Sequence, residues 1–467
     1  MKRKLRRSFA SLLLVAWGLL SAYAASGRPA AATQVVDAPT VRFGTAAAVV
    51  AEGEGRAVIP VRVSGDLSRD VEVTVSVRGG TASVGRDVAL DAPSTTLVFR
   101  AGAAPMQEVE LLVHADEEDE GVEYLDLTLQ SGDAALASPK RFRLWIRDAE
   151  LYPDLRAGAL AERLRVDFEP VSMLGAEQAV DTLLSVVWNA AGSVHGVFTD
   201  AEAAVSTKRN PRAVAREQGI GVDGVWPAAL DDDTARRDLH LLLPVQADVK
   251  AARRSRQVLA AVEGERADEA APYLRPREGM KGDVARALLY FYALYPEQAD
   301  AQGLERLKPT LAQWMEEDPV DADELRRNAL VARYQGKPNP FVIAPELAER
   351  TFNLRGSYPT PTVSFVRQSA SVSEADSVAV IEVAVSGAGN ADVTFDVVLD
   401  ETASTAGADD LSGFRQWTVT VPAGTPDGAV QRVRIPIARD EEREETEQAT
   451  LVLENLSGFA RTGEVTQ

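Results

Sequence analysis

The 467-residue sequence contains no cysteine and only three histidines, His114, His195 and His240. The absence of cysteine excludes disulfide bonds, structural cysteine-zinc sites, thiol catalysis and a lipidated cysteine anchor. Beyond the N-terminus, no apolar run approaches the ~20 residues that a membrane-spanning helix needs. The folded protein must therefore be stabilised by packed cores, to which bound ions can add.

The N-terminal residues have the pattern of a secretory signal peptide. Basic residues from Lys2 to Arg7 precede an apolar run from Phe9 to Leu20, and Ala22-Tyr23-Ala24 supplies the small-residue spacing of a cleavage site. We expect cleavage after Ala24, a secreted or periplasmic location, and no stable membrane insertion afterwards.

Acidic residues are distributed unevenly along a chain of net charge −20. Residues 34–150 hold 11 basic and 20 acidic side chains, and residues 356–467 hold seven and 18. Residues 151–355 are nearly balanced, with 26 basic and 32 acidic side chains. The flanks therefore suit cations, and any site for a polyanion belongs in the middle.

An internal repeat relates the two flanks. Val41–Gly65 matches Val363–Gly387, and both flanks alternate apolar and polar residues, as in Val71–Val77 and Ala379–Val385. This period is typical of half-buried antiparallel strands, and its recurrence at short spacing predicts a β-sandwich on each side.

The two flanks also share motifs in the same order. Each has an acidic residue after its opening strand, a Thr-Ala-Ser turn, an apolar strand ending in Ala-Gly, and an acidic run before another apolar strand. In the first copy these are Glu52–Gly55, Thr81–Asp87, Leu97–Gly102, Asp116–Glu120 with Glu123, and Leu125–Leu129. In the second they are Glu374, Thr402–Asp409, Val421–Gly424, Asp440–Glu442 with Glu444 and Glu447, and Leu451–Leu453.

This set of motifs resembles the Calx-β family, whose turn carboxylates at one end of the sandwich can bind Ca²⁺. The resemblance implies candidate ligands in the first copy at Glu52, Asp87, Asp116, Glu120 and Asp148. In the second copy it implies Glu374, Asp409, Asp440 and Glu444. The alternative interpretation is a solvated acidic rim that resists aggregation and holds no ion.

The middle region changes to a helical period. Apolar stripes predict helices over Lys281–Tyr295, Leu304–Glu317 and Asp321–Tyr334, and the better strand candidates are Val194–Phe198 and Leu239–Leu243. We therefore predict a multidomain α+β protein. Its expected parts are a signal peptide (1–24), a linker (25–38), a sandwich (39–150), a mixed, mainly helical domain (151–355) and a second sandwich (356–467).

Six ordered blocks in the middle region resemble bacterial endonuclease I. They are Val222–Pro227, Asp238–Pro244, Met280–Ala287, Trp314 with Asp318–Asp321, Arg326–Asn328, and Asn339–Phe341 with Pro345–Ala348. The resemblance implies a ββα-metal, or His-Me finger, nuclease fold. In that family a histidine activates water, and a glutamate and an asparagine hold Mg²⁺.

The residues that carry this chemistry are altered here. By the resemblance, the Glu-His pair becomes Asp223-Gly224. The metal-holding asparagine falls near Val249-Lys250, so the ammonium of Lys250 takes the place of the amide. Glycine accepts no proton, and an ammonium repels Mg²⁺ while attracting phosphate. The sequence thus predicts a nuclease frame that has lost ordinary cutting, unless Asp223 and a displaced imidazole from His240 or His195 restore it.

The densest basic run of the chain after its N-terminus, Lys250 with Arg253, Arg254 and Arg256, suits nucleic-acid phosphates, or alternatively pairs with acidic neighbours. The leading hypothesis is a secreted pseudonuclease that binds DNA, RNA or another surface, flanked by sandwiches able to hold Ca²⁺. The alternatives are an active Mg²⁺-dependent nonspecific nuclease and a Ca²⁺-stiffened structural or adhesion protein. The oligomeric state is left open.

Overall fold

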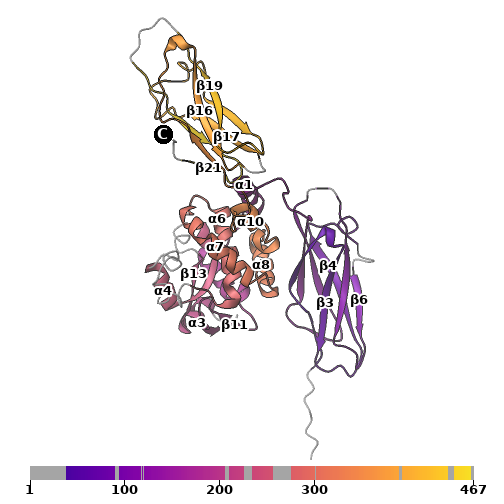
Figure 1. The fold of residues 1–467 in the computed structure, drawn as a ribbon. Helices are drawn as coiled ribbons and strands as arrows, with labels where there is room; N and C mark the ends of the chain where they lie inside the picture. Colours follow the sequence, from indigo (N-terminus) through magenta and orange to yellow (C-terminus); the bar gives the residue numbers. More distant parts are fainter. Residues whose placement is uncertain are drawn as a thin grey trace, which may run out of the picture.

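The computed structural model describes residues 38–463, except 90–93, 117, 119, 206–209, 226–233, 256–274, 300, 389–391 and 440–445. The predicted signal peptide and most of the linker lie outside the described residues. Within the described part of the chain, no helix is long and apolar enough to cross a membrane. Figure 1 shows two sandwiches attached at different places to a helical middle region.

The first sandwich consists of two five-stranded sheets. One has the order β5 (Val88–Ala89), β7 (Met106–Val113), β3 (Arg56–Ser64), β1 (Thr40–Phe43) and β9 (Ala135–Leu136). The other has the order β2 (Ala47–Ala51), β10 (Arg141–Arg147), β8 (Val122–Gln130), β4 (Val71–Gly80) and β6 (Ser94–Phe99).

Apolar and polar residues alternate along these strands, as the sequence predicts, and the apolar ones form the core between the two sheets. Val71, Val73 and Val75 of β4 are at most 2% exposed, while the residues between them face outward. On β10, Phe142 faces inward and its ring lies 5.5 Å from that of Phe43. Burial of each such side chain stabilises the fold by about 1.5–3 kcal/mol.

The middle region contains two short hairpins and a set of helices. The hairpins are β11 (Ser193–His195) with β12 (Glu202–Ala204), and β13 (Ile220–Gly224) with β14 (Leu242–Gln246). The helices are α1 (Ala157–Phe168), α2 (Ala176–Thr182), α3 (Pro211–Glu217), α4 (Ala247–Ser255), α6 (Lys281–Leu294), α7 (Ala301–Glu317), α8 (Ala322–Gln335), α9 (Pro340–Ile343) and α10 (Leu347–Phe352). A π-helical turn, η2 (Leu183–Val187), follows α2.

The three predicted helices are confirmed as α6, α7 and α8. The α8 helix begins where the Asp321 side chain accepts a hydrogen bond from the Glu324 amide, and it ends at Gly336 in a left-handed conformation. The α6 helix is buried along its whole length and forms the centre of the largest core. A Cβ on Gly282 would lie 1.9 Å from the carbonyl oxygen of Asp318, so only glycine permits this approach.

The strand predicted over Leu239–Leu243 is partly wrong. The strand begins at Leu242, because the preceding Asp238 and His240 form a buried turn instead. The predicted strand over Val194–Phe198 is shorter, and ends at His195. The strand β13 was not predicted from its sequence, because it contains two glycines and little alternation.

The second sandwich has four strands in one sheet and three in the other. The first sheet has the order β19 (Ala429–Pro436), β16 (Val378–Ser386), β15 (Thr362–Phe365) and β21 (Arg461–Thr462). The second has the order β18 (Gln416–Val421), β17 (Val393–Leu399) and β20 (Leu451–Glu454). The predicted fold class is therefore confirmed as two sandwiches around a mixed helical region.

The first sandwich contacts the middle region through a small apolar cluster. Trp145 on β10 packs with Ala332 on α8 and Ile343 on α9. Ion pairs border the cluster, with Arg147 3.1 Å from Glu346 and Asp126 3.6 Å from Arg333. The second sandwich meets the middle region through an Arg461–Glu305 pair at 2.9 Å.

Candidate functional site

The candidate nucleic-acid site lies on a strand–strand–helix unit formed by β13, β14 and α4. The strands are antiparallel, with Asp223 opposite Leu243 and Gly224 opposite Leu242. The helix α4 follows β14 directly and packs against both strands. This order and packing agree with the ββα arrangement implied by the sequence resemblance.

The structure brings Asp223, Gly224 and Lys250 together on this unit. Asp223 is completely buried, and Gly224 is the last residue of β13. Lys250, in the first turns of α4, donates a hydrogen bond from Nζ to the carbonyl oxygen of Val222. The ammonium therefore lies against the strand that carries Asp223 and Gly224, where the resemblance implies a metal-holding amide.

His240 occupies a buried polar network instead of an open cleft. Its ring packs 4.9 Å from that of Tyr290, and its Nε2 lies 3.1 Å from the Lys337 carbonyl oxygen, to which it donates. Burial is the largest influence on the imidazole and lowers its pKa. Its backbone amide donates to Asp238, whose carboxylate also accepts from Tyr290, Tyr295 and Gln335 at 2.8–2.9 Å. Asp238 thus anchors the turn before β14.

The other histidines lie elsewhere. His195 is on β11, half exposed, with Nε2 3.9 Å from Glu202. His114 is in the first sandwich, beside the carbonyl oxygen of Arg86. Among the described contacts, neither imidazole meets Asp223.

The basic run is only partly within the described residues. Arg253 and Arg254 lie on α4, and nothing is described of their side chains. Arg256 lies outside the described residues.

A buried ion network joins α6 to α8, and the sequence analysis did not identify it. The Arg286 guanidinium donates to both Glu324 oxygens at 2.6 and 2.7 Å, and all these groups are buried. Asp283 pairs with Arg327, whose guanidinium also lies 4.5 Å from the Trp188 ring centroid. The paired residues are 38 positions apart in Arg286–Glu324 and 44 positions apart in Asp283–Arg327. No local sequence pattern predicts ion pairs over such separations.

In the first sandwich, a second candidate site collects carboxylates at one end. Asp87, Glu120 and Glu123 each offer an oxygen within 4.8 Å of the others. Burial raises the pKa of Glu52, as do the nearby charges of Asp148, Asp116 and Glu120. All five ligands implied by the sequence resemblance are therefore close together, and Glu123 joins them.

The protonation of Glu123 reflects this crowding. Burial, followed by the charge of Asp87, raises the pKa of Glu123 to about 7. Buried oxygens of Glu120 and Glu123 accept no hydrogen bond from the described residues. The set has the oxygen donors and negative charge that Ca²⁺ requires, so the residues fit this ion.

One cation belongs to the cluster already. The Arg86 guanidinium lies 2.9 Å from Asp87 and 3.0 Å from Glu118, and it also pairs with Glu120. It therefore neutralises part of the carboxylate charge and competes with any ion bound there.

The second sandwich repeats this arrangement with a shifted register. The Thr81 hydroxyl accepts from the amide of Tyr124, and the Thr405 hydroxyl accepts from that of Gln448. The structural equivalent of Thr81 is therefore Thr405, three residues after Thr402. This register also aligns Glu447 with Glu123.

The shifted register changes the candidate ligands. The Asp410 carboxylate accepts from the Gly407 amide, as that of Asp87 accepts from Ser83. Burial raises the pKa of Glu447, and so do the charges of Asp410 and Glu374. Asp410, the neighbour of the predicted Asp409, thus joins Glu374 and Glu447. Asp440 and Glu444 lie outside the described residues.

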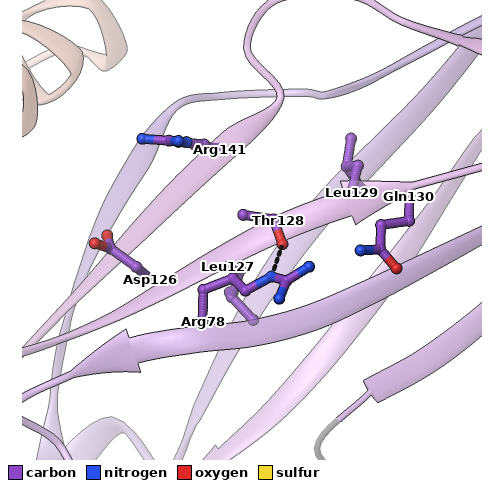
Figure 2. A pocket seen from close by; sticks show the side chains of 7 residues that line it. All are labelled: Arg78, Asp126, Leu127, Thr128, Leu129, Gln130 and Arg141. Atoms are coloured by element: carbon purple, nitrogen blue, oxygen red, sulfur yellow. Dashed lines mark hydrogen bonds between the residues drawn. The ribbon is translucent and has the colours of Figure 1, made fainter.

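A groove with a volume of about 480 Å³ lies on the outer sheet face of the first sandwich, away from β13. Figure 2 shows Arg78, Thr128, Gln130 and Arg141 along its walls, with Arg78 donating to Thr128. The groove contains none of the predicted site residues.

Two protein families match the regions of the chain that contain the candidate sites. The family described as Endonuclease I matches residues 197–346. The Calx-beta domain family matches residues 36–150 and 359–466.

Individual relatives match shorter parts. An "Extracellular ribonuclease" of Bacillus subtilis (strain 168) is 35% identical over 88 residues, which are 16% of this chain and 31% of the relative. That of Bacillus amyloliquefaciens is 36% identical over 88 residues, covering 16% and 30%. The chain therefore spans about a third of the length of these curated relatives.

Two solved structures each match about a quarter of this chain. The apo-form Calx CBD1 domain is 26% identical, with a TM-score of 0.23, and the match covers 24% of this chain and all of that domain. The Calx CBD2 domain is 12% identical, with a TM-score of 0.22, covering 24% and 87%.

Proposed function

Because this chain combines an endonuclease I domain with two Calx-beta domains, we propose that it is an exported protein that binds RNA or DNA without cutting it. The observation that carries the proposal is the pair of substitutions on the ββα unit. Gly224 supplies no proton acceptor, and the Lys250 ammonium bonds to the Val222 carbonyl.

Phosphodiester hydrolysis requires a base for the attacking water and a cation opposite the leaving oxygen. The residues present do not fit Mg²⁺, because Lys250 places a positive charge where an oxygen ligand is needed. The described imidazoles supply no replacement base, since His240 donates to a carbonyl in the core and His195 lies beside Glu202. The chain is therefore expected to bind a phosphodiester without hydrolysing it.

The same lysine favours binding of a phosphate. An ammonium attracts a phosphate oxygen, and Lys250 lies on the unit where the endonuclease I family holds its metal and the scissile phosphate. The two extracellular ribonuclease relatives make RNA the first ligand to test. Those relatives and the N-terminal pattern support export, and the acidic flanks confine polyanion binding to the middle region.

We further propose that the first sandwich binds Ca²⁺ through the carboxylates around Asp87, Glu120 and Glu123. Calx-beta domains are of a calcium-binding type. The ion would offset the mutual repulsion of Glu52, Asp148 and their neighbours. Its contribution is structural, because the cluster and the ββα unit belong to different domains.

One observation favours a second candidate, an active Mg²⁺-dependent nuclease. The relatives that share 35–36% identity are named ribonucleases. Asp223 also retains a carboxylate next to the position of the lost histidine. In this alternative, binding and cutting occur together and both require the metal.

Binding and cutting are separated by two measurements on one preparation. Fluorescence anisotropy with a labelled 20-nucleotide RNA in chelator should show binding that weakens as salt rises. The Lys250→Ala variant should bind several-fold more weakly, whereas Lys140→Ala, an exposed lysine in the first sandwich, should not. Gel analysis of the same RNA with Mg²⁺ should show intact strands. Equal binding by the two variants would contradict the proposed site, and Mg²⁺-dependent cutting would favour the second candidate.

A further inference from the structure

The groove on the outer sheet face of the first sandwich has an arginine on either side. Arg78 comes from β4 and Arg141 from β10, and Thr128 on β8 lies between them (Figure 2). Within the described part of the chain, neither guanidinium forms an ion pair with a carboxylate. Both positive charges are therefore available to a ligand in the groove.

A β-bulge in β4 turns Arg78 over the neighbouring strand. The register of β4 and β8 shifts between Val77 and Gly79, so Arg78 is the extra residue of the bulge. Bulges of this kind re-aim a side chain beside functional sites. Here the Nε of Arg78 donates a hydrogen bond to the Thr128 hydroxyl at 3.2 Å. The other N–H groups of this guanidinium remain as donors to a ligand.

Arg141 borders the groove from the other side of Thr128. The two residues are directly opposite each other on adjacent strands, where Cβ atoms on the same face are about 4.5–5.5 Å apart. No described residue accepts a hydrogen bond from the Arg141 side chain. This side chain can therefore turn to an anion over Thr128, where the Arg78 guanidinium already lies.

The carboxylate that lines the groove, Asp126, is already neutralised. Arg143 donates to its two oxygens at 2.8 and 2.7 Å, and Arg333 lies 3.6 Å away. Burial lowers the pKa of Arg333, and the positive charges of Arg143 and Arg141 lower it further. With Arg78, four guanidiniums gather around one carboxylate, so an added oxyanion would relieve the repulsion among them.

The rest of the lining favours a hydroxylated ligand. The Gln130 side chain offers both a donor and an acceptor, as hydroxyl groups require. Among the described residues that line the groove, none has an aromatic ring on which a nucleobase could stack. The volume of about 480 Å³ is within the range of about 300–1,000 Å³ that small-molecule sites occupy.

The charge of the surrounding domain limits the ligand to a short one. Residues 34–150 contain 11 basic and 20 acidic side chains. This excess repels a polyanion. Salt screens the distant acidic residues from a single anionic group, because charges interact weakly beyond about 8 Å at physiological ionic strength. A ligand with one oxyanion is therefore attracted by the nearby guanidiniums more than it is repelled by the domain.

We propose that the groove binds an anionic sugar, that is, a hydroxylated ring that carries one carboxylate or phosphate. The oxyanion accepts hydrogen bonds from Arg78 and Arg141, since a guanidinium matches the geometry of both groups. Gln130 binds the ring hydroxyls, and Thr128 positions Arg78. This site shares no residue with the ββα unit.

Titration calorimetry of the full chain with glucuronate, glucose 6-phosphate, glucose and inorganic phosphate tests the ligand class. At least one of the two sugar acids should bind about tenfold or more tightly than glucose and inorganic phosphate, and the acid that binds identifies the oxyanion. Equal binding of glucose would exclude a role for the guanidiniums. Equal binding of inorganic phosphate would exclude recognition of the ring, and no binding by either acid would overturn the proposal.

Substitutions in the groove test the site. Arg78→Gln and Arg141→Gln should each weaken binding of the sugar acid at least about tenfold, because a charge-assisted hydrogen bond is lost. The matched control is Arg62→Gln, which removes an exposed arginine from the other sheet. Thr128→Val should weaken binding by releasing Arg78, whereas Thr128→Ser should retain it. Unchanged affinity in both arginine variants would overturn the site.

RNA binding by the same variants tests the choice of ligand. Arg78→Gln and Arg141→Gln should bind labelled RNA as the unaltered chain does, because the groove and the ββα unit lie in different domains. Weaker RNA binding by these variants would assign the groove to nucleic acid and overturn the sugar proposal. Lys250→Ala should leave the affinity for the sugar acid unchanged, so the two sites can fail independently.

Discussion

The Nζ atom of Lys250 donates a hydrogen bond to the carbonyl oxygen of Val222, one residue before the buried Asp223. This contact joins the first turn of α4 to β13 and places a positive charge there, which disfavours a divalent metal ion at the same position. Replacing Lys250 and Gly224 together should therefore restore metal-dependent hydrolysis to the ββα unit.

The double variant Gly224→His with Lys250→Asn should gain Mg²⁺-dependent cleavage of RNA or plasmid DNA. A positioned general base contributes about 10²- to 10⁴-fold, so the gain over the wild-type background should be at least about a hundredfold. Gel-based time courses with Mg²⁺ and with chelator measure it. Each single variant serves as a control and should remain near background. A double variant without gain, yet folded by circular dichroism, would argue against the alignment of Gly224 with the catalytic histidine.

Calcium should stabilise the first sandwich. Binding to the folded state alone adds about 2.7 kcal/mol when free Ca²⁺ is 100 times its Kd. Calorimetry with Ca²⁺ and with chelator should show this as a higher unfolding temperature of one transition. Glu123→Gln should reduce the shift strongly, and Glu110→Gln, on an exposed position of β7, should leave it unchanged. An identical unfolding temperature in both solutions would exclude the ion site.

Without Ca²⁺, the stability of the first sandwich should fall as the pH rises from about 4.5 to about 7. Burial and Asp87 raise the folded-state pKa of Glu123 to about 7 from the ordinary value of 4.5. Over this window the folded state binds more protons than the unfolded state, so deprotonation penalises folding. Urea unfolding at pH 5 and pH 7.5 in chelator measures the slope. Glu123→Gln should flatten it, and an unchanged slope in that variant would assign the effect to another group.

Arg86 should act as an internal competitor of the ion. Its guanidinium pairs with Asp87, Glu118 and Glu120, so Ca²⁺ must displace it or share its ligands. Arg86→Ala is expected to bind Ca²⁺ several-fold more tightly by titration calorimetry. Arg56→Ala, whose exposed pair with Glu110 lies on the same sandwich, provides the control. Weaker binding by Arg86→Ala would show that the arginine organises the ligands.

The buried pair of Arg286 and Glu324 should contribute strongly to the stability of the middle domain. Removing Glu324 leaves the buried Arg286 charge with only the longer pair to Asp283 at 3.7 Å, and breaking a buried pair costs up to about 3–5 kcal/mol. Glu324→Gln should therefore lower the urea midpoint of this domain markedly. Glu162→Gln, which breaks the exposed pair with Arg165, should not change it measurably. Equal midpoints would mean that the Arg286 charge finds another partner.

The sequence predicted those features that depend on the local spacing of apolar residues. Alternation in β4 and the apolar stripes of α6, α7 and α8 correspond directly to elements of the structure. The proximity of Glu52, Asp87 and Asp148 also follows from the sandwich resemblance, because turns at one end of the sheets meet.

Features that depend on register or distant pairing could not be predicted in this way. By sequence alone, the second Thr-Ala-Ser motif aligns Thr402 with Thr81. The hydrogen bonds instead make Thr405 the equivalent of Thr81 and bring Asp410 into the acidic cluster of the second sandwich. Similarly, nothing in the sequence joins Asp238 to Gln335, 97 positions away.

The most direct test of the central claim is the fate of RNA bound by the unaltered chain. Labelled RNA at a concentration above its Kd is incubated with the protein and Mg²⁺ at neutral pH, and strand integrity and anisotropy are followed together over hours. We predict a bound, intact strand whose affinity falls in Lys250→Ala. Rapid Mg²⁺-dependent cleavage by the unaltered chain would contradict the loss of hydrolytic chemistry at Gly224 and Lys250.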